Sequence, residues 1–89
     1  MRFIVDEITK VEDSGERRLI LYGEVERGTL KSKSKVHLEI LGQDYMVDKI
    51  RDGEKSLEEA SAGEQVGVIL KGVQNVRIQL GEVLVEASD

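Results

Sequence analysis

The sequence contains no cysteine, no proline and no tryptophan, and its only aromatic residues are Phe3, Tyr22 and Tyr45. The absence of cysteine excludes disulfides, thiolate zinc sites and cysteine nucleophiles. Three aromatic rings supply little surface for stacking bases or sugars. No apolar run approaches the roughly 18 residues of a membrane span, and no signal-peptide pattern opens the chain. We therefore expect a cytoplasmic protein that has no membrane partner.

Positive charge is scarce overall but concentrated in one stretch. The 89 residues carry 13 basic and 18 acidic side chains, a net charge of −5, which opposes general binding of nucleic acid. Residues 17–35 hold six basic and two acidic side chains, so this stretch is positive while the rest of the chain is negative. Any nucleic-acid contact is therefore predicted to lie in this stretch.

Alternating apolar residues predict strands over 3–11, 18–27, 45–51, 65–71 and 83–85. A further extended stretch ends at Leu41, with Val36, Leu38 and Ile40 facing inward. Residues 12–15 form a predicted hairpin turn. The spacing in Val5-Asp6-Glu7-Ile8 breaks strict alternation, which predicts a bulge.

Two segments have weaker patterns. Residues 52–64 look helical by local rules, because Ser56 and Glu59 form a capping-box pair, but they carry too few apolar residues for a packed helix face. We predict a short strand and a turn there. Residues 73–81 are predicted to be a connection with one helical turn around residues 76–78.

About seven short strands separated by glycine turns, with no helical spacers, indicate an all-β fold. The aliphatic composition favours a small closed antiparallel β-barrel filled by valine, leucine and isoleucine. We predict that residues 1–89 form one domain.

Three phrases carry a resemblance to a known family. They are Val5-Asp6-Glu7-Ile8-Thr9-Lys10-Val11, Gly23-Glu24-Val25-Glu26-Arg27-Gly28-Thr29-Leu30-Lys31, and residues 55–68, which read KSLEEASAGEQVGV. Together with Gly81-Glu82-Val83-Leu84, they resemble the second domain of translational GTPases, the β-barrel that follows the G domain in elongation factor Tu. The resemblance spans residues 3–85. It implies a translation-factor-type barrel with Greek-key features and structural roles for five glycines, which are Gly23, Gly28, Gly63, Gly67 and Gly81.

The departures from that family concern function. The GTPase domain is absent from this sequence and no G-x-x-x-x-G-K-[ST] motif occurs, so we expect no nucleotide cofactor and a barrel that acts without the GTPase. In elongation factor Tu the barrel holds the aminoacyl end of tRNA with a Glu, a His-Arg pair and an Asn. Those positions correspond here to Arg51, to Gly53 with Glu54, and to Gln65. The charges are reversed and the histidine is lost, so we expect no aminoacyl-tRNA binding in that manner.

The basic stretch is the best candidate surface. We predict that Lys31, Lys33 and Lys35 share one strand face, with Arg17, Arg18 and Arg27 nearby, as a ridge that contacts RNA phosphates. Arg18 and Lys33 replace two family glycines. The alternative is that the lysines protect an exposed strand edge from pairing with other chains.

Other polar residues give no site. His37 is predicted to face solvent without partners for metal binding or base catalysis, and no serine has an activating base. The acidic residues lack calcium-loop spacing, and the tyrosines are expected to cover the barrel ends. We predict no catalytic residue, no metal and no cofactor.

The sequence therefore favours a non-catalytic binding module whose partner is the ribosome, tRNA or a translation protein. The alternative is a protein-interaction domain that docks through an exposed apolar patch. The predicted patch consists of Ile20, Ile69, Leu80 and Leu84.

Overall fold

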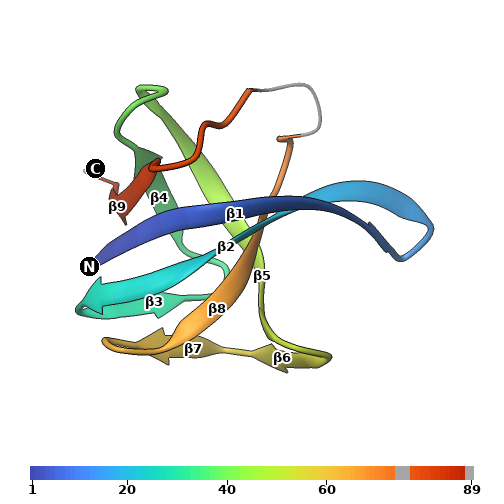
Figure 1. The fold of residues 1–89 in the computed structure, drawn as a ribbon, viewed down its shortest axis with the longest axis horizontal. Coiled ribbons are helices and arrows are strands. Elements are labelled where there is room, and N and C mark those ends of the chain that lie inside the picture. The colour runs from blue at the N-terminus through green and yellow to red at the C-terminus, as the bar shows by residue number, and fades with distance from the viewer. Residues whose placement is uncertain (74–76, 88–89) are drawn as a thin grey trace.

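The chain opens with a long antiparallel hairpin. In the computed structural model, which describes residues 1–73 and 77–87, β1 (Arg2–Asp13) pairs along its length with β2 (Glu16–Arg27) (Figure 1). Ser14 and Gly15 turn the chain between them, both with positive φ. The predicted strands over 3–11 and 18–27 and the turn between them are confirmed.

Shorter strands follow the hairpin. They are β3 (Thr29–Lys31), β4 (Lys35–Leu38), β5 (Gln43–Asp52), β6 (Lys55–Leu57), β7 (Glu59–Ser61), β8 (Gln65–Leu70) and β9 (Val83–Glu86). The segment 52–64 forms two short strands joined by turns, so the prediction that it is not a helix is confirmed.

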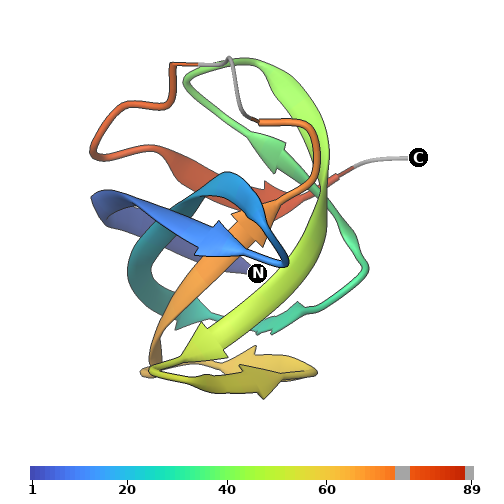
Figure 2. The ribbon, with the colours of Figure 1, turned by 90° about the vertical axis from the view of Figure 1, so that its right-hand side faces the viewer.

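Six of these strands close into a ring. The order around the ring is β1, β2, β8, β5, β4 and β9, and every pairing is antiparallel, including that of β9 with β1. The view in Figure 2 shows the strands curving around a common interior. β6 extends the sheet beside β5, while β3 and β7 form a separate two-stranded sheet. The predicted all-β fold with a closed antiparallel sheet is confirmed.

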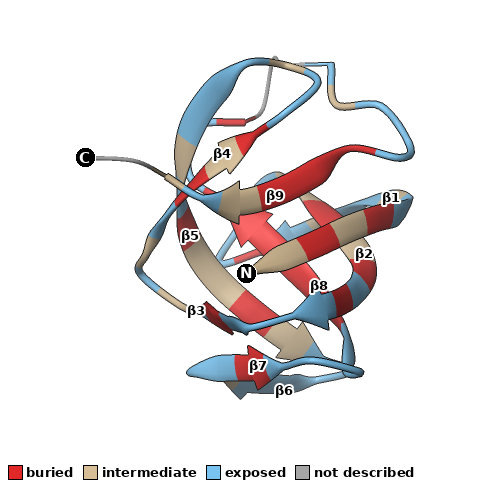
Figure 3. Ribbon diagram, turned by 90° about the vertical axis from the view of Figure 1, so that its left-hand side faces the viewer, coloured by how far each residue is buried: buried red, intermediate tan, exposed pale blue. Residues whose placement is uncertain are grey.

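The interior is aliphatic, as the composition predicted. Phe3 is fully buried and is the one aromatic residue in the core, which is otherwise mainly valine, leucine and isoleucine. Buried and less buried residues alternate along the first half of β1 and along β3, β4 and β7 in Figure 3, whereas β8 is buried from Val66 to Leu70. This pattern arises because successive side chains of a strand point to opposite faces. The free energy of burial therefore comes from many β-branched and leucine side chains.

Two sequence predictions concern the connections between strands, and the first of them is wrong. β4 ends at Leu38, and the chain turns over residues 39–42, where the Gly42 amide donates to the Leu38 carbonyl at 2.7 Å. Ile40 is therefore 56% exposed and does not face inward. In the later connection, Val76 lies outside the described residues, and Arg77 and Ile78 are not helical.

Two of the five predicted structural glycines show why no side chain fits. Gly28 has φ +75°, a conformation that glycine adopts without strain, and it turns β2 into β3. Gly23 lies against β1, where an added Cβ would approach the Ile4 carbonyl oxygen to 1.8 Å. Gly63 and Gly81 also have positive φ, and Gly67 packs against Ile20 and Tyr22.

Across residues 1–73 and 77–87, the structure holds no helix with the length and apolar character needed to cross a membrane.

Candidate functional site

Of the three register shifts between the described strands, two shape the candidate surface of the ring. In β1 the register with β2 shifts between Val5 and Glu7, and in β5 the register with β8 shifts between Val47 and Lys49. A bulge inserts one residue, so two consecutive side chains reach the same side of the sheet. Asp6 and Glu7 are accordingly both exposed in β1, and neither Asp48 nor Lys49 enters the core in β5. Each bulge therefore adds charged groups to the outer surface without changing the core.

The bulge in β1 borders a cleft of about 400 Å³. Its lining includes Arg51, Gly53 and Gln65, so the structure brings together three of the four positions that correspond to the aminoacyl pocket of elongation factor Tu. Glu54 is not among the lining residues. The remaining walls come from β1, β2, β5 and β8 and include Asp6, Glu7, Tyr22 and Asp52. Tyr22 therefore lines the cleft.

The charges of this cleft favour cationic over anionic groups. Asp6, Glu7 and Asp52 contribute three carboxylates, and Arg51 is the single cation in the lining. Like charges repel an approaching anion, and the walls of a cleft strengthen that repulsion. The sequence-based expectation that an aminoacyl end is not held in the manner of elongation factor Tu stays a prediction.

The bulge in β5 creates a cluster of ion pairs, which we call the β5 cationic cluster. It consists of the cations Arg18, Lys33, Lys49 and Arg51 and the carboxylates Asp13 and Asp48. Asp13, at the end of β1, accepts hydrogen bonds from Lys49 Nζ at 2.8 and 3.0 Å, and Arg51 Nη2 lies 3.5 Å away. The tip of the hairpin is thereby joined to β5.

Asp48 is the second anionic centre of the cluster. Lys33 Nζ donates to Asp48 Oδ1 at 2.9 Å, and Arg18 pairs with the other carboxylate oxygen. These two hydrogen bonds, Lys33 first, lower the pKa of Asp48 to about 2. The Lys49 hydrogen bond likewise lowers the pKa of Asp13 below its usual value. Both carboxylates are therefore held in their charged form.

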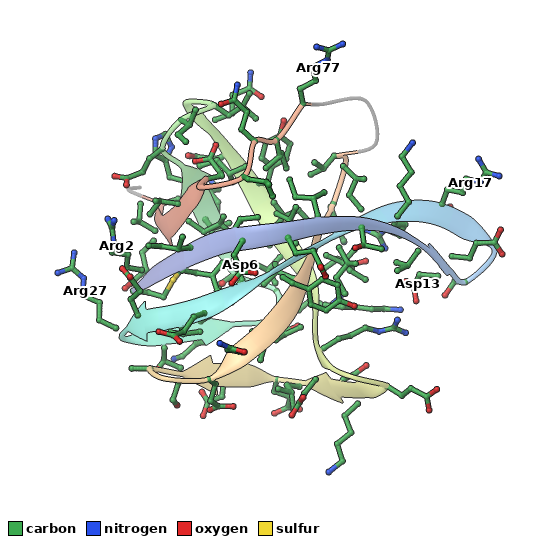
Figure 4. All side chains as sticks on the ribbon, viewed as in Figure 1. Arg2, Asp6, Asp13, Arg17, Arg27 and Arg77 are labelled. Carbon is green, nitrogen blue, oxygen red and sulfur yellow. The ribbon has the colours of Figure 1, made fainter. Side chains whose placement is uncertain are left out.

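The predicted basic ridge does not exist as a single strand face. Lys31 ends β3 and Lys35 begins β4, but Lys33 lies in the turn between them with φ +64°. The prediction that these three lysines share one face is wrong, because the turn interrupts the period of two. Arg18 is only 13% exposed and is committed to ion pairs. Figure 4 shows Arg17 and Arg27 at opposite ends of the molecule.

Lys49 and Arg51 belong to the same surface. Lys49 was not predicted from the sequence, and Arg51 was predicted only as a position that corresponds to the aminoacyl pocket. A signal for them exists, because Val47-Asp48-Lys49-Ile50 repeats the spacing of Val5-Asp6-Glu7-Ile8. The same break in alternation that predicts a bulge in the first strand therefore also predicts one at Asp48.

His37 has a partner that its sequence spacing did not suggest. Its Nδ1 lies 2.7 Å from Asp44 Oδ1, because β4 and β5 place these residues opposite each other. The expectation that His37 stands alone is therefore wrong. In the part of the chain that the structure describes, no group of three or more His, Cys, Asp or Glu side chains could hold a metal ion.

The predicted apolar patch also needs correction. Ile20, Ile69 and Leu84 are buried, and of the four predicted residues only Leu80 is exposed, at 64%. Among residues 1–73 and 77–87, Ile40 in the turn after β4 is the other strongly exposed aliphatic residue. Strand alternation predicts that Ile20, Ile69 and Leu84 face outward. They are buried nevertheless, because both faces of their strands are covered.

The closed ring, its antiparallel pairings and the order of its strands define a β domain of the translation-factor type. The crystal structure of a bacterial selenocysteine-specific elongation factor, EF-Sec, matches 96% of this chain with a TM-score of 0.81 and 25% sequence identity. Elongation factor SelB from Methanococcus maripaludis matches the same share at 21% identity, with TM-scores of 0.79 in its apo form and 0.78 in complex with the GTP analogue GppNHp. The resemblance to a translational GTPase β domain is thereby confirmed.

The similarity covers a small part of each factor. This chain spans 14% of the bacterial EF-Sec chain and 18% of each SelB chain. No protein-family model matches the sequence. The comparisons therefore establish the fold and its translation-factor character.

Proposed function

We propose that the chain is a non-catalytic binding module that works with the translation machinery in the cytoplasm, in contact with ribosomal RNA, tRNA or a translation protein. The observation that carries this proposal is the match of 96% of the chain to a β domain of elongation factors. A non-catalytic role is supported by the sequence, which offers neither a phosphate-binding loop nor an activated nucleophile.

The test is co-sedimentation of the purified chain with ribosomes over a series of potassium chloride concentrations. We expect the chain to sediment with ribosomes at low salt and to be released as salt rises, because phosphate contacts weaken with ionic strength. An unrelated acidic protein of similar size is the control. A chain that stays in the supernatant at every salt concentration, and that causes no mobility shift of tRNA, would rule out the RNA-based function.

A protein partner is the second candidate, and two exposed aliphatic residues favour it. Ile40 and Leu80 are exposed residues in two loops, and both loops are joined to Glu82. The Glu82 carboxylate accepts a hydrogen bond from the Ile40 amide at 2.8 Å, and Leu80 lies two residues before Glu82 in the chain. A protein partner that covered both side chains would bury their apolar surface at one contact. Replacing both by Ser would weaken binding to a translation protein and leave co-sedimentation with protein-free ribosomal RNA unchanged.

A further inference from the structure

We propose that the β5 cationic cluster contacts the phosphate backbone of double-helical RNA. This inference rests on the proposed function and names the surface and the form of RNA. Four cations surround two carboxylates in the cluster, so it keeps two positive charges on a chain whose net charge is −5. A local excess of cations is the electrostatic requirement for a phosphate contact.

The cluster keeps donors available to solvent. The Lys33 side chain is 64% exposed and gives Asp48 one hydrogen bond, so two of its three N–H groups remain for a ligand. Lys49 is 32% exposed and lies beside Lys33 in the wall of a groove of about 860 Å³ that also includes Lys31. On the other side, Arg18 and Lys71 line a second groove of about 250 Å³ together with the carboxylates Glu16 and Asp48.

The backbone at Lys33 provides an independent indication. Lys33 has φ +64°, in the left-handed region that glycine adopts without strain and that a lysine adopts at a cost. The turn is fixed by the Lys33 amide, which donates to the Val47 carbonyl at 2.8 Å. Strained residues gather at functional sites, and here the strain places an exposed ammonium group at the edge of the cluster.

The shape and composition of the cluster favour a helix over a single strand. None of the three aromatic residues lines either groove, and binding of single strands depends on stacking bases against aromatic rings. Double-helical RNA is recognised through its phosphates and 2′-hydroxyls instead. Glu58 and Glu59 also line the larger groove, and Glu59 lies opposite Lys31 in the pairing of β3 with β7, so the RNA backbone would follow the Lys33 and Lys49 side.

The test measures fluorescence anisotropy of a labelled RNA hairpin with a fully paired stem, titrated with the wild type, Lys33→Gly and Lys49→Gln at several potassium chloride concentrations. We expect each variant to bind about three- to tenfold more weakly at low salt and to lower the slope of log K against log salt by about one. Lys33→Gly removes the charge at a position where glycine relieves backbone strain, and it also removes the hydrogen bond to Asp48. Urea denaturation of each variant therefore checks that it is folded under the binding conditions.

Arg77→Gln is the matched control, because it removes one exposed positive charge from the loop before β9 (Figure 4). It should bind the hairpin within about twofold of the wild type, since a distant charge is screened by salt. Three results would overturn the inference. They are equal affinities of the wild type and both cluster variants, an equal loss of affinity in the control, and tighter binding to a labelled unpaired RNA of the same length than to the hairpin. Ribosome co-sedimentation that persists in the cluster variants would leave the proposed function standing while this surface assignment fails.

Discussion

Gly23 occupies a point at which the backbones of β1 and β2 leave no room for a side chain. An added Cβ would lie 1.8 Å from the Ile4 carbonyl oxygen, and a backbone atom cannot move aside as a flexible side chain can. We expect Gly23→Ala to lower the free energy of unfolding by about 3 kcal/mol or more. Urea denaturation followed by circular dichroism measures the change.

Gly42→Ala is the matched control for that substitution. Gly42 also turns the chain, with φ +75°, but an added Cβ there would meet no atom within 4 Å. Its cost is therefore limited to backbone strain, about 1 to 2 kcal/mol. Equal losses at Gly23 and Gly42 would show that steric exclusion at Gly23 is not the cause.

Asp48 should make the stability depend on pH in the acid range. Its folded-state pKa of about 2 is lower than its ordinary value of 3.8, so its contribution to stability is present above about pH 3.8 and is lost as pH falls toward 2. Asp48→Asn should cost roughly 2 kcal/mol at neutral pH and flatten this dependence. Urea denaturation at a series of acidic pH values tests both effects.

The pKa of Asp13 is lowered as well, so Asp13 also makes the protein less stable as pH falls. The contribution of Asp48 is therefore the difference between the free energies of unfolding of the wild type and Asp48→Asn at each pH. Asp6→Asn serves as the control, because Asp6 makes no ion pair among the described residues. A pH profile of Asp48→Asn that parallels the wild type would contradict the role assigned to the Lys33 and Arg18 pairs.

At the scale of elements, the turn between β4 and β5 is held by a side chain from a distant segment. Glu82 is buried, and its carboxylate accepts hydrogen bonds from the amides of Ile40 at 2.8 Å, Leu41 at 3.0 Å and Val83 at 2.9 Å. A buried carboxylate with three donors fixes the loop far more firmly than the loop's own residues can.

We expect Glu82→Gln to destabilise the protein by about 1 to 3 kcal/mol, because one accepting oxygen becomes an amide group that cannot accept. The amides of Ile40 and Leu41 should exchange with solvent faster than the neighbouring core amides. Hydrogen exchange followed by NMR resolves this, with Glu86→Gln at the end of β9 as the control. Unchanged exchange at Ile40 and Leu41 would show that the turn is fixed by other contacts.

Most elements could be predicted from the sequence because strand alternation is a local property. Val5-Asp6-Glu7-Ile8 indicated the first bulge, and the low apolar content of residues 52–64 excluded a helix. The basic ridge failed because a turn at Lys33 looks like a continuing strand when lysines and serines alternate. The partners of Asp13 could not be predicted, since they depend on how the hairpin folds against β5.

At the scale of the whole molecule, β9 completes the ring. Its residues pair with β1 on one side and β4 on the other, and Leu84 is fully buried. Without β9 the ring would open along two strand edges and expose part of its core. We therefore expect a chain that ends at Gly81 to lack a cooperative unfolding transition in circular dichroism.

Leu84→Ala gives a graded version of the same experiment. It keeps the backbone pairing and removes the buried side chain, so the expected loss is about 2 to 5 kcal/mol without loss of cooperativity. A truncated chain that unfolds as cooperatively as the full chain would show that the ring does not need its last strand.

The two bulges show how such a scaffold can acquire new charged side chains on its surface. Each bulge is a single extra residue in a strand. The flanking residues Val5, Val47 and Ile50 remain in the core, and Ile8 packs against its edge. An inserted residue thus adds one outward side chain, which forms a pair with its outward neighbour, without a compensating change inside. Asp6 and Asp48 could therefore serve as insertion points for grafting recognition groups. We expect the gain or loss of one residue at these two points to cost less stability than the same change elsewhere in a strand.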